Sequence, residues 1–201
     1  MNRVLLATRN TKKLDELRRI LDAAGIERLE VVGLADVPPF EEPVESAATF
    51  EGNALIKARD AVRATGLPAV ADDSGLTVDA LNGMPGVLSA RWAGRHGDDD
   101  ANLRLVLEQL GDVPDERRGA AFVCAAALVR PGGKEDVVVG RWEGSLTREP
   151  RGSHGFGYDP IFVPSGETRT SAELDPAEKD SISHRGRALR ALVPYLTTLG
   201  D

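Results

Sequence analysis

The stretch LPAVADDSG, which runs from Leu67 to Gly75, is the most informative part of this sequence for both fold and chemistry. Its first residues, Leu67–Ala71, have the composition of a short buried strand, and Gly75 is expected to end that strand. Asp72 and Asp73 would then stand at the strand's carboxyl end, where two neighbouring carboxylates repel each other and resist the loss of water. A divalent cation is the simplest group that would hold both acids there. The pattern therefore indicates metal-assisted chemistry on phosphate groups.

Magnesium suits this acid pair, because it prefers one or two carboxylates together with water and substrate phosphates. The structural alternative is a capped turn, in which both aspartates accept hydrogen bonds from backbone N–H groups. The apolar strand that leads directly into the acids favours the metal site over the turn.

The overall composition indicates one domain over residues 1–201, long enough for a substantial hydrophobic core. No segment has membrane-spanning length, so we expect no membrane partner. Cys124 is the single cysteine, which excludes an internal disulfide and favours a reducing cytoplasm. The formal net charge of −7 argues against nucleic acid as a partner. A small anionic substrate would need a local basic cluster, a cation, or both.

Hydrophobic periodicity predicts helices that alternate with strands early in the chain and a hairpin in its middle. Strands are expected at residues 4–7, 29–32, 67–71, 76–81, 120–129 and 137–139, and helices after residue 11, from near residue 46 to residue 66, around residues 103–110 and around residues 189–199. The predicted fold class is α/β, with a mixed, partly antiparallel central sheet flanked by helices.

A polar turn between the first strand and the first helix consists of Thr8, Arg9, Asn10, Thr11, Lys12 and Lys13. Backbone N–H groups at the start of a helix bind phosphate, and Lys12 or Lys13 would add full charge. The turn lacks the glycines of a Walker A loop. Its structural alternative is a polar helix cap with solvated lysines.

The second predicted helix carries Asn53 and Lys57 four residues apart, which places them on one face, and Glu45 precedes it. The lysine could contact phosphate or metal-bound water. The alternative is a surface lysine, because lysine is seldom buried without a partner.

A segment rich in glycine, Gly152–Pro160, contains Phe156 and Tyr158. Glycines let a backbone come close to a flat ligand, and an aromatic ring can stack on a base. The alternative is a loop whose aromatic rings fold into the core.

Lys179, His184 and Arg185 add positive charge before and at the start of the last helix, for which Ser183 is the expected N-cap. Positive charge in a first helical turn is disfavoured by the helix dipole, which hints at a function for His184 and Arg185. The alternative is an ordinary basic surface.

Other sites are disfavoured by the sequence. The acidic run Asp98–Asp100 precedes a predicted helix, whose dipole it would complement, so we do not expect a metal site there. His96 and His154 lack partners at the spacing of zinc ligands, and the Gly-x-Ser-x-Gly motif of serine hydrolases is absent.

Together and in this order, these segments resemble the inosine triphosphate pyrophosphatase family, also called the Ham1-like or RdgB-like nucleoside triphosphate pyrophosphatases. The ordered set carries the resemblance, since no single motif is specific enough. The matching residues are Ala7–Asn10 with Lys13, Thr49–Phe50 with Asn53–Ala54 and Lys57–Ala58, Ala71–Leu76, Pro85–Gly86 with Ser89–Arg91, Gly155–Pro160 and Ser183–Arg185.

The resemblance implies two lobes around a deep cleft, a homodimer, and magnesium-dependent hydrolysis of a nucleoside triphosphate to the monophosphate and pyrophosphate. The implied substrates are inosine, deoxyinosine and xanthosine triphosphates (ITP, dITP and XTP), so the protein would remove deaminated purines from the nucleotide pool.

The resemblance also implies roles for individual residues. Asp73 would bind magnesium and accept a proton, and we add Asp72 and Lys57 as catalytic candidates. The implied substrate-binding residues are Thr8, Arg9, Asn10, Thr11, Lys12, Lys13, Ser74, Phe156, Gly157, Tyr158, Asp159, Lys179, His184 and Arg185.

Two departures from the family pattern leave the metal site open. Many relatives have adjacent glutamates where this chain has Val44-Glu45, and a further glutamate where it has Gly52. We expect Glu45 to be the second ligand beside Asp73, although Glu41 or Glu42 could replace it. A carboxylate on magnesium loses basicity, so either Asp72 and Asp73 divide the two tasks or the metal itself acidifies the water.

Three other functions remain as alternatives. A Maf-like pyrophosphatase acting on other nucleotides would open with a Ser-x-Arg-Arg turn, which Thr8-Arg9-Asn10 does not match. A non-catalytic nucleotide-binding regulator would not need the acids and lysines together. A protein-interaction module is favoured only if the motifs lie far apart in space.

Overall fold

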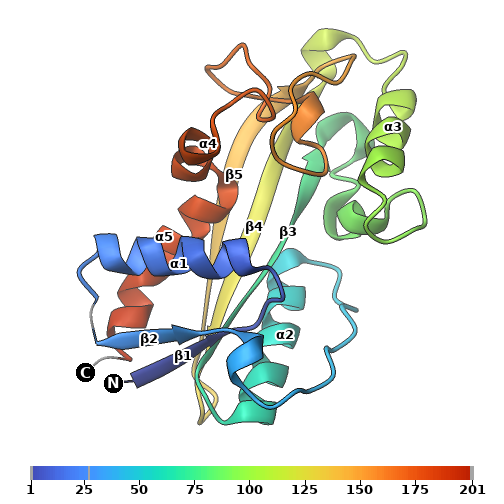
Figure 1. The fold of residues 1–201 in the computed structure, drawn as a ribbon. Coiled ribbons are helices and arrows are strands. Elements are labelled where there is room, and N and C mark those ends of the chain that lie inside the picture. Colours follow the sequence, from blue (N-terminus) through green and yellow to red (C-terminus); the bar gives the residue numbers. More distant parts are fainter. Residues whose placement is uncertain (1, 27, 200–201) are drawn as a thin grey trace. The chain divides into compact units, whose positions relative to one another are not determined.

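The computed structural model describes residues 2–26 and 28–199, without the side chain of Lys12, and Figure 1 shows the arrangement of the elements. The strands are β1 Asn2–Leu6, β2 Leu29–Val32, β3 Ala69–Val78, β4 Gly119–Val129, β5 Glu135–Leu146 and β6 Phe162–Pro164. The α-helices are α1 Thr11–Ala23, α2 Phe50–Thr65, α3 Asp99–Gln109, α4 Pro176–Ile182 and α5 His184–Thr197.

In the described part of the chain, the strands form one sheet in the order β2-β1-β3-β4-β5-β6. Strand β1 pairs in parallel with both β2 and β3, whereas β5 pairs antiparallel with β6. Strands β4 and β5 are neighbours joined by residues 130–134, a connection too short for a parallel crossover. The predicted mixed, partly antiparallel sheet with flanking helices is confirmed.

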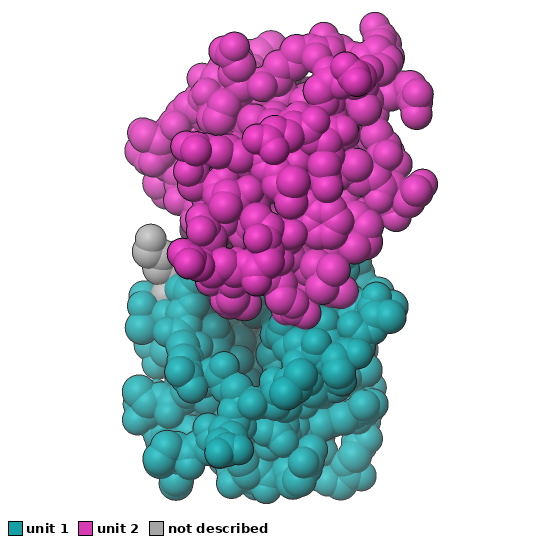
Figure 2. All heavy atoms as spheres, turned by 90° about the vertical axis from the view of Figure 1, so that its right-hand side faces the viewer, with its two compact units in different colours: residues 1–73, 124–140, 186–201 teal, residues 74–123, 141–185 magenta. Residues whose placement is uncertain are grey.

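The chain divides into two compact units, coloured separately in Figure 2. Unit 1 consists of residues 1–73, 124–140 and 186–201, and unit 2 of residues 74–123 and 141–185. The boundaries fall inside β3, β4, β5 and α5, so each of these elements contributes residues to both units. The single domain over residues 1–201 and the deep cleft between two lobes stay predictions.

The core of unit 1 follows from the alternation of side chains along β1. Val4 and Leu6 pack with apolar residues of α1 and α5, whereas Leu5 packs with Ala61 of α2. Helices α1 and α2 therefore cover opposite faces of this part of the sheet (Figure 1). From these two sides, Lys13 of α1 and Asn53 of α2 both reach β3, at Asp72 and Asp73.

Helix α2 begins four residues later than the sequence predicts, at Phe50 rather than near Ser46. Thr49 is its N-cap and accepts a hydrogen bond from the backbone N–H of Gly52 at 3.1 Å. The backbone N–H of Ala47 donates a hydrogen bond to Oδ1 of Asn53 at 2.9 Å. A side-chain contact, and not a helical backbone hydrogen bond, therefore holds this residue ahead of the helix. The predicted end is confirmed, because Gly66 adopts the left-handed conformation that closes many helices.

Strand β3 differs most from the prediction. It is continuous over Ala69–Val78, so the expected break at Gly75 is wrong, and so is the separate strand over residues 76–81, whose last part is a 3-10 turn. A glycine weakens a strand without necessarily ending it. Asp72 and Asp73 consequently lie in the middle of a strand, where their charges need specific partners.

Unit 2 is organised around α3 and the distal parts of β3, β4 and β5. Leu103 and Val106 of α3 pack with Phe122 and Trp142 in its apolar cluster. Asp98 caps α3 by accepting a hydrogen bond from the N–H of Ala101 at 3.2 Å, which confirms that the acidic run belongs to a helix start.

Two short elements of unit 2 were missed by the sequence prediction. Helix α4 begins with Pro176 at its first position and has Asp175 as N-cap, a recognisable start signal on a helix of only 7 residues. Strand β6 has only 3 residues, which is too short for any periodic pattern.

Unit 2 also contains a buried guanidinium. Arg118 is 2% exposed and donates hydrogen bonds to the carbonyl oxygens of Leu110, Leu146 and Thr147, at 2.7, 2.9 and 2.7 Å. These bonds fasten the end of α3 to the end of β5.

Replacing Arg118 with methionine should therefore destabilise the fold. The variant keeps the apolar bulk but removes three hydrogen bonds to carbonyl oxygens, of which that of Leu110 keeps another donor, the N–H of Val113 at 3.1 Å. Each buried group left unsatisfied costs about 1–3 kcal/mol. We expect the free energy of unfolding, measured by urea denaturation, to fall by about 2–4 kcal/mol. The control is Arg104→Met, because the side chain of Arg104 is 70% exposed and pairs with Asp100 on the surface of the same helix. Equal losses in both variants would contradict this role of Arg118.

Candidate active site

A cluster of opposite charges surrounds the middle of β3 in unit 1, and we call it the carboxylate cluster. Its members are Lys13, Glu45, Asn53, Lys57, Asp72 and Asp73. The sequence predicted a functional role for all of them except Asn53, which it placed on the same helix face as Lys57, and the contacts of the structure link them.

Asp72 is paired with Lys13 from the first turn of α1. The Nζ of Lys13 donates to both carboxylate oxygens, at 2.9 and 2.8 Å, and only 4% of the Asp72 side chain is exposed. The Sγ of Cys124 lies 3.9 Å from the Oδ2 of Asp72. Asp72 thus has a full countercharge within its own unit.

Asp73 is held by α2 instead. Asn53 Nδ2 donates to Oδ2 of Asp73 at 3.0 Å, and Lys57 Nζ lies 3.7 Å from its Oδ1. Neighbouring residues of a strand project to opposite faces, which explains why the two aspartates meet different helices. The expectation that one cation joins both acids does not fit this arrangement.

Lys57 connects Asp73 with Glu45. Its Nζ donates to Glu45 Oε1 at 2.7 Å, so the ammonium lies between two carboxylates that come from different segments. The surface alternative for Lys57 is wrong, because only 21% of its side chain is exposed.

Burial and neighbouring charges shift the pKa values of Asp73 and Lys57. Burial raises the pKa of Asp73, and the charges of Glu45 and Asp72 add to the rise, while Lys57 and the hydrogen bond from Asn53 oppose it. Burial by itself would lower the pKa of Lys57, but Asp73 and Glu45 outweigh it, so that pKa is raised. Lys57 therefore stays charged, and Asp73 is a stronger base than a surface aspartate.

The donor set near Lys57 matches the chemistry of a magnesium site. Glu45 and Asp73 supply hard carboxylate oxygens on either side of a position that already holds a positive charge. Over the residues that the structure describes, no three His, Cys, Asp or Glu side chains are grouped as metal ligands. Magnesium is compatible with so few protein ligands when phosphates and water complete its shell.

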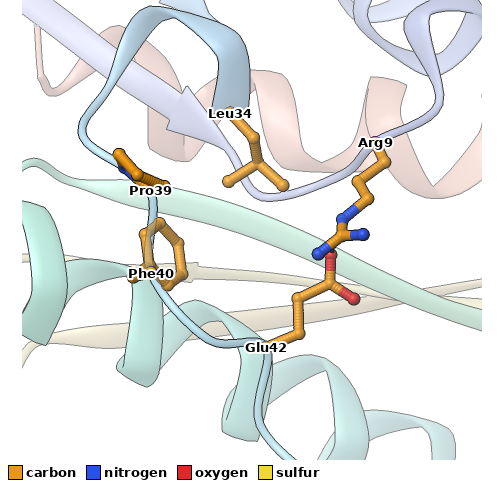
Figure 3. Close-up of a pocket in the computed structure, with 5 residues that line it drawn as sticks. All are labelled: Arg9, Leu34, Pro39, Phe40 and Glu42. Atoms are coloured by element: carbon orange, nitrogen blue, oxygen red, sulfur yellow. Dashed lines mark ion pairs between the residues drawn. The ribbon is translucent and has the colours of Figure 1, made fainter.

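The turn before α1 forms a separate small feature of unit 1. Thr8 Oγ1 accepts a hydrogen bond from the N–H of Asn10 at 3.2 Å, and helix α1 begins at Thr11. Figure 3 shows Arg9 reaching across to Glu42, and their Nε and Oε1 atoms are 2.6 Å apart. The pair closes one side of a pocket of about 150 Å³ that Leu34, Pro39 and Phe40 also line, which is smaller than typical ligand pockets of about 300–1,000 Å³.

Two further sequence predictions concern Glu42 as an alternative metal ligand and Lys12 as a phosphate-binding residue. Glu42 pairs with Arg9, whereas Glu45 shares the Lys57 ammonium with Asp73, so Glu45 is the glutamate that the structure places in the same ion-pair group as Asp73. The side chain of Lys12 lies outside the described part of the structure.

A second cluster lies in unit 2 and is built around Asp159, which is 2% exposed. Its carboxylate accepts hydrogen bonds from the N–H of Phe156 at 2.8 Å, from Ser171 Oγ at 2.7 Å and from Lys179 Nζ. A Cβ on Gly155 would come within 2.0 Å of Oδ2 of Asp159, so this close loop needs glycine. Asp159 thus shapes the loop that presents Phe156.

The two aromatic rings of this loop have different environments. Phe156 is 61% exposed, and Lys179 Nζ lies 5.4 Å from its ring centroid. Tyr158 is buried, donates its hydroxyl to the carbonyl of Ser89 at 2.8 Å, and has a pKa raised by burial. The core alternative is therefore correct for Tyr158, and Phe156 offers the available stacking face.

His184 and Arg185 open α5, which confirms their place in a first helical turn. The His184 ring is buried and stacks on Phe122, with 4.9 Å between ring centroids and planes 14° apart. Ser183 immediately precedes the helix in an extended conformation. Ser74, the remaining predicted contact, lies within β3.

Two residues in these clusters were not predicted as functional. Asp99 accepts a hydrogen bond from the N–H of Gly157 at 2.9 Å, and no sequence signal connects them. Asn53 was placed on the same helix face as Lys57, and that spacing was the available signal for its contact with Asp73.

The fold and these clusters define a class: a mixed α/β protein in which buried carboxylates of a central strand pair with lysines of two helices. Comparison with known sequences narrows the class. A model of the Ham1 family matches residues 4–195, and the chain belongs to this family.

Relatives extend over the whole chain. A protein from Nocardia farcinica named dITP/XTP pyrophosphatase is 67% identical over 201 residues, covering 100% of this chain and 98% of the relative. A solved nucleoside-triphosphatase, or dITP/XTP pyrophosphatase, from Mycobacterium abscessus is 65% identical with a TM-score of 0.83, covering 96% of this chain and 99% of that one. A HAM1 protein from Coxiella burnetii is 45% identical with a TM-score of 0.89, covering 98% and 100%.

The raised pKa of Asp73 has a consequence for stability. The pKa of Asp73 is higher in the folded protein than its ordinary value of 3.8. The folded state therefore loses stability relative to the unfolded state as pH rises from the ordinary pKa through the raised one and the group ionises. Replacing Asp73 with asparagine removes this titration, so the variant should be more stable than wild type near pH 7, with an advantage that disappears at about pH 3.5. Urea denaturation in metal-free buffer across this range measures it. An advantage that is absent at pH 7, or constant with pH, would show that burial of the charge is not the cause.

Proposed function

We propose that this protein hydrolyses dITP, ITP and XTP to the monophosphate and pyrophosphate, and so removes deaminated purines from the nucleotide pool. The relatives named dITP/XTP pyrophosphatase support the choice of substrates. The observation that carries the chemistry is the position of Lys57 between Glu45 and Asp73, beside the pair of Lys13 and Asp72.

In this proposal the attacking group is a water molecule that reaches the α-phosphorus, and Asp73 assists the loss of its proton. Burial raises the pKa of Asp73, so without a metal it is a better base than a surface aspartate would be. Magnesium on the same carboxylate would lower that basicity, and Asp73 would then act by holding an ion whose charge makes the water more acidic. Asn53 keeps one oxygen of Asp73 engaged and leaves the other, Oδ1, toward Lys57. Asp72, held by Lys13, would act mainly by keeping that lysine in place.

The leaving pyrophosphate carries much negative charge, and lysines would stabilise it as the bond breaks. Lys13 and Lys57 are the candidates in unit 1, and the turn Thr8–Thr11 would add polar groups at the start of α1. Lys179 of unit 2 is a further candidate. Lys57 and Lys179 each have a carboxylate partner that an incoming phosphate would replace, whereas Lys13 would reach the phosphates while it stays paired with Asp72.

Magnesium is the cofactor that we propose, with Asp73 and Glu45 as its protein ligands. When bound, it would neutralise phosphate charge and make the pyrophosphate a better leaving group. Lys57 would then turn from the two carboxylates toward the phosphates, since it cannot share its position with the ion.

Recognition of the base is proposed for unit 2. Phe156 offers an exposed ring for stacking, and Arg185 or His184 would donate to the carbonyl at position 6 of hypoxanthine or xanthine. Because the face of His184 packs on Phe122, its ring edge is the part that would meet a base. Adenine presents an amine at this position, so a donor would reject it strongly.

We also propose that the protein is a cytoplasmic homodimer that does not bind nucleic acid, in keeping with the net charge of −7. Among the helices that the structure describes, none has the length and apolar character needed to cross a membrane.

The proposed reaction is tested by incubating the purified protein with Mg²⁺ and equal concentrations of dITP, XTP, dGTP or dATP. We expect pyrophosphate from dITP and XTP, with kcat/KM for dATP lower by about 10²-fold or more. Asp73→Asn should lower kcat by about 10²–10⁴-fold, as removal of a general base does. Orthophosphate as the product would mean cleavage at the γ-phosphate, and tight binding without turnover would favour the regulator.

The proposed metal site has its own test. EDTA should abolish pyrophosphate release, and Mg²⁺ should restore it. Glu45→Gln should raise the Mg²⁺ concentration for half-maximal activity by at least about tenfold, since even outer partners of metal ligands are worth 10–100-fold. Glu42→Gln, which breaks only the pair with Arg9, should not. If Glu42→Gln or Glu41→Gln raises this Mg²⁺ concentration and Glu45→Gln does not, Glu45 is not the second metal ligand.

A further inference from the structure

Asn53 is fully buried and uses both ends of its side-chain amide. Its Oδ1 accepts a hydrogen bond from the backbone N–H of Ala47 at 2.9 Å, and its Nδ2 donates to Oδ2 of Asp73 at 3.0 Å. A backbone N–H only donates and an ionised carboxylate only accepts, so a single amide orientation satisfies both partners. Asn53 therefore links two groups that come from distant parts of the sequence.

The contact with Ala47 fastens the segment that carries Glu45, two residues earlier. Gly52 supports the same geometry, because a Cβ at that position would come within 2.5 Å of the Cβ of Ala47. The segment thus lies directly against the first turn of α2, at a distance that only glycine permits. One end of the Asn53 amide holds this segment, and the other end holds Asp73.

Lys57 does not provide an equally firm link between Glu45 and Asp73. Its Nζ is 2.7 Å from Glu45 Oε1 but 3.7 Å from Asp73 Oδ1, which is beyond hydrogen-bond distance. A lysine also moves on a flexible four-carbon stem, whereas the amide of asparagine is one carbon from the helix backbone.

We propose that Asn53 is a positioning residue that sets the spacing of Glu45 and Asp73 for hydrolysis. The inference rests on the function proposed above and adds a residue to it. Asn53 touches neither substrate nor metal in this scheme and acts through the two carboxylates. Misplacing a reacting group by about 1 Å can cost about 10²-fold in rate, so loss of this link should lower kcat far more than it weakens substrate binding.

Two substitutions separate the contacts of Asn53. Asn53→Asp keeps the size of the side chain and the acceptor for Ala47, but it replaces the donor toward Asp73 with another carboxylate. Asn53→Ala removes both contacts without adding charge.

Asn102 offers a matched control in unit 2. It is also a buried helix asparagine whose Oδ1 accepts a hydrogen bond from a backbone N–H, that of Ala93 at 2.7 Å. Within residues 2–26 and 28–199, its Nδ2 has no hydrogen-bond partner. Asn102→Asp therefore buries a carboxylate at a similar loop-to-helix contact without touching Asp73.

The experiment compares wild type, Asn53→Asp, Asn53→Ala and Asn102→Asp. It measures kcat and KM for dITP, binding of the α,β-methylene analogue of dITP by calorimetry with Mg²⁺, and thermal unfolding by circular dichroism. For both Asn53 variants we expect kcat to fall by about 30–100-fold, while KM and the Kd of the analogue stay within about threefold of wild type. Asn102→Asp should lose stability but keep kcat within about twofold.

The proposal is overturned if both Asn53 variants keep kcat within about threefold of wild type, or if kcat falls only in proportion to the folded fraction. It is also overturned if analogue binding weakens as much as kcat, or if Asn102→Asp loses as much activity. Wild-type protein that releases no pyrophosphate would refute the proposed function itself, an outcome distinct from an active wild type with unaffected variants.

Discussion

Compensation of two buried carboxylates by lysines is the interaction on which the rest of unit 1 depends. Asp72 and Asp73 lie inside β3, where a charge is tolerated only with a partner. Lys13 compensates Asp72 from α1, and Lys57 with Asn53 compensates Asp73 from α2. Because α1 and α2 cover opposite faces of the sheet, these pairs tie both helices to one strand. Removing Lys13 would leave the carboxylate of Asp72 buried without its countercharge, whereas Lys57 keeps Glu45 as a partner when the charge of Asp73 is removed.

The same pairs connect stability to chemistry. A carboxylate with a raised pKa is costly for the fold and useful as a base, and Asp73 is such a group. The lysines that neutralise the acids are also the charges that a triphosphate would need. In the proposed reaction, Lys57 would exchange its carboxylate partners for phosphate without being left buried alone. The buried amide of Asn53 would keep the carboxylates in place during that exchange.

The sequence predicted the elements with clear periodicity well, including the strand over residues 120–129 and the final helix. It failed at Gly75, because β3 continues beside β4 in the sheet, a pairing between distant segments that the local glycine signal does not show. It also treated Phe156 and Tyr158 alike, since their glycine contexts are the same, whereas a contact with Ser89 buries only Tyr158. The resemblance to a family named the site residues, but it did not show which lysine pairs with which acid.

The central claim is that Asp73 and Glu45 form one functional unit with Lys57 between them. A crystal structure with Mg²⁺ and the α,β-methylene analogue of dITP tests it most directly. The account predicts oxygens of Asp73 and Glu45 in the magnesium shell, the Lys57 ammonium moved onto a phosphate, and Asp72 still paired with Lys13. Magnesium bound by Asp72 or Glu42, with Lys57 still between Glu45 and Asp73, would contradict it.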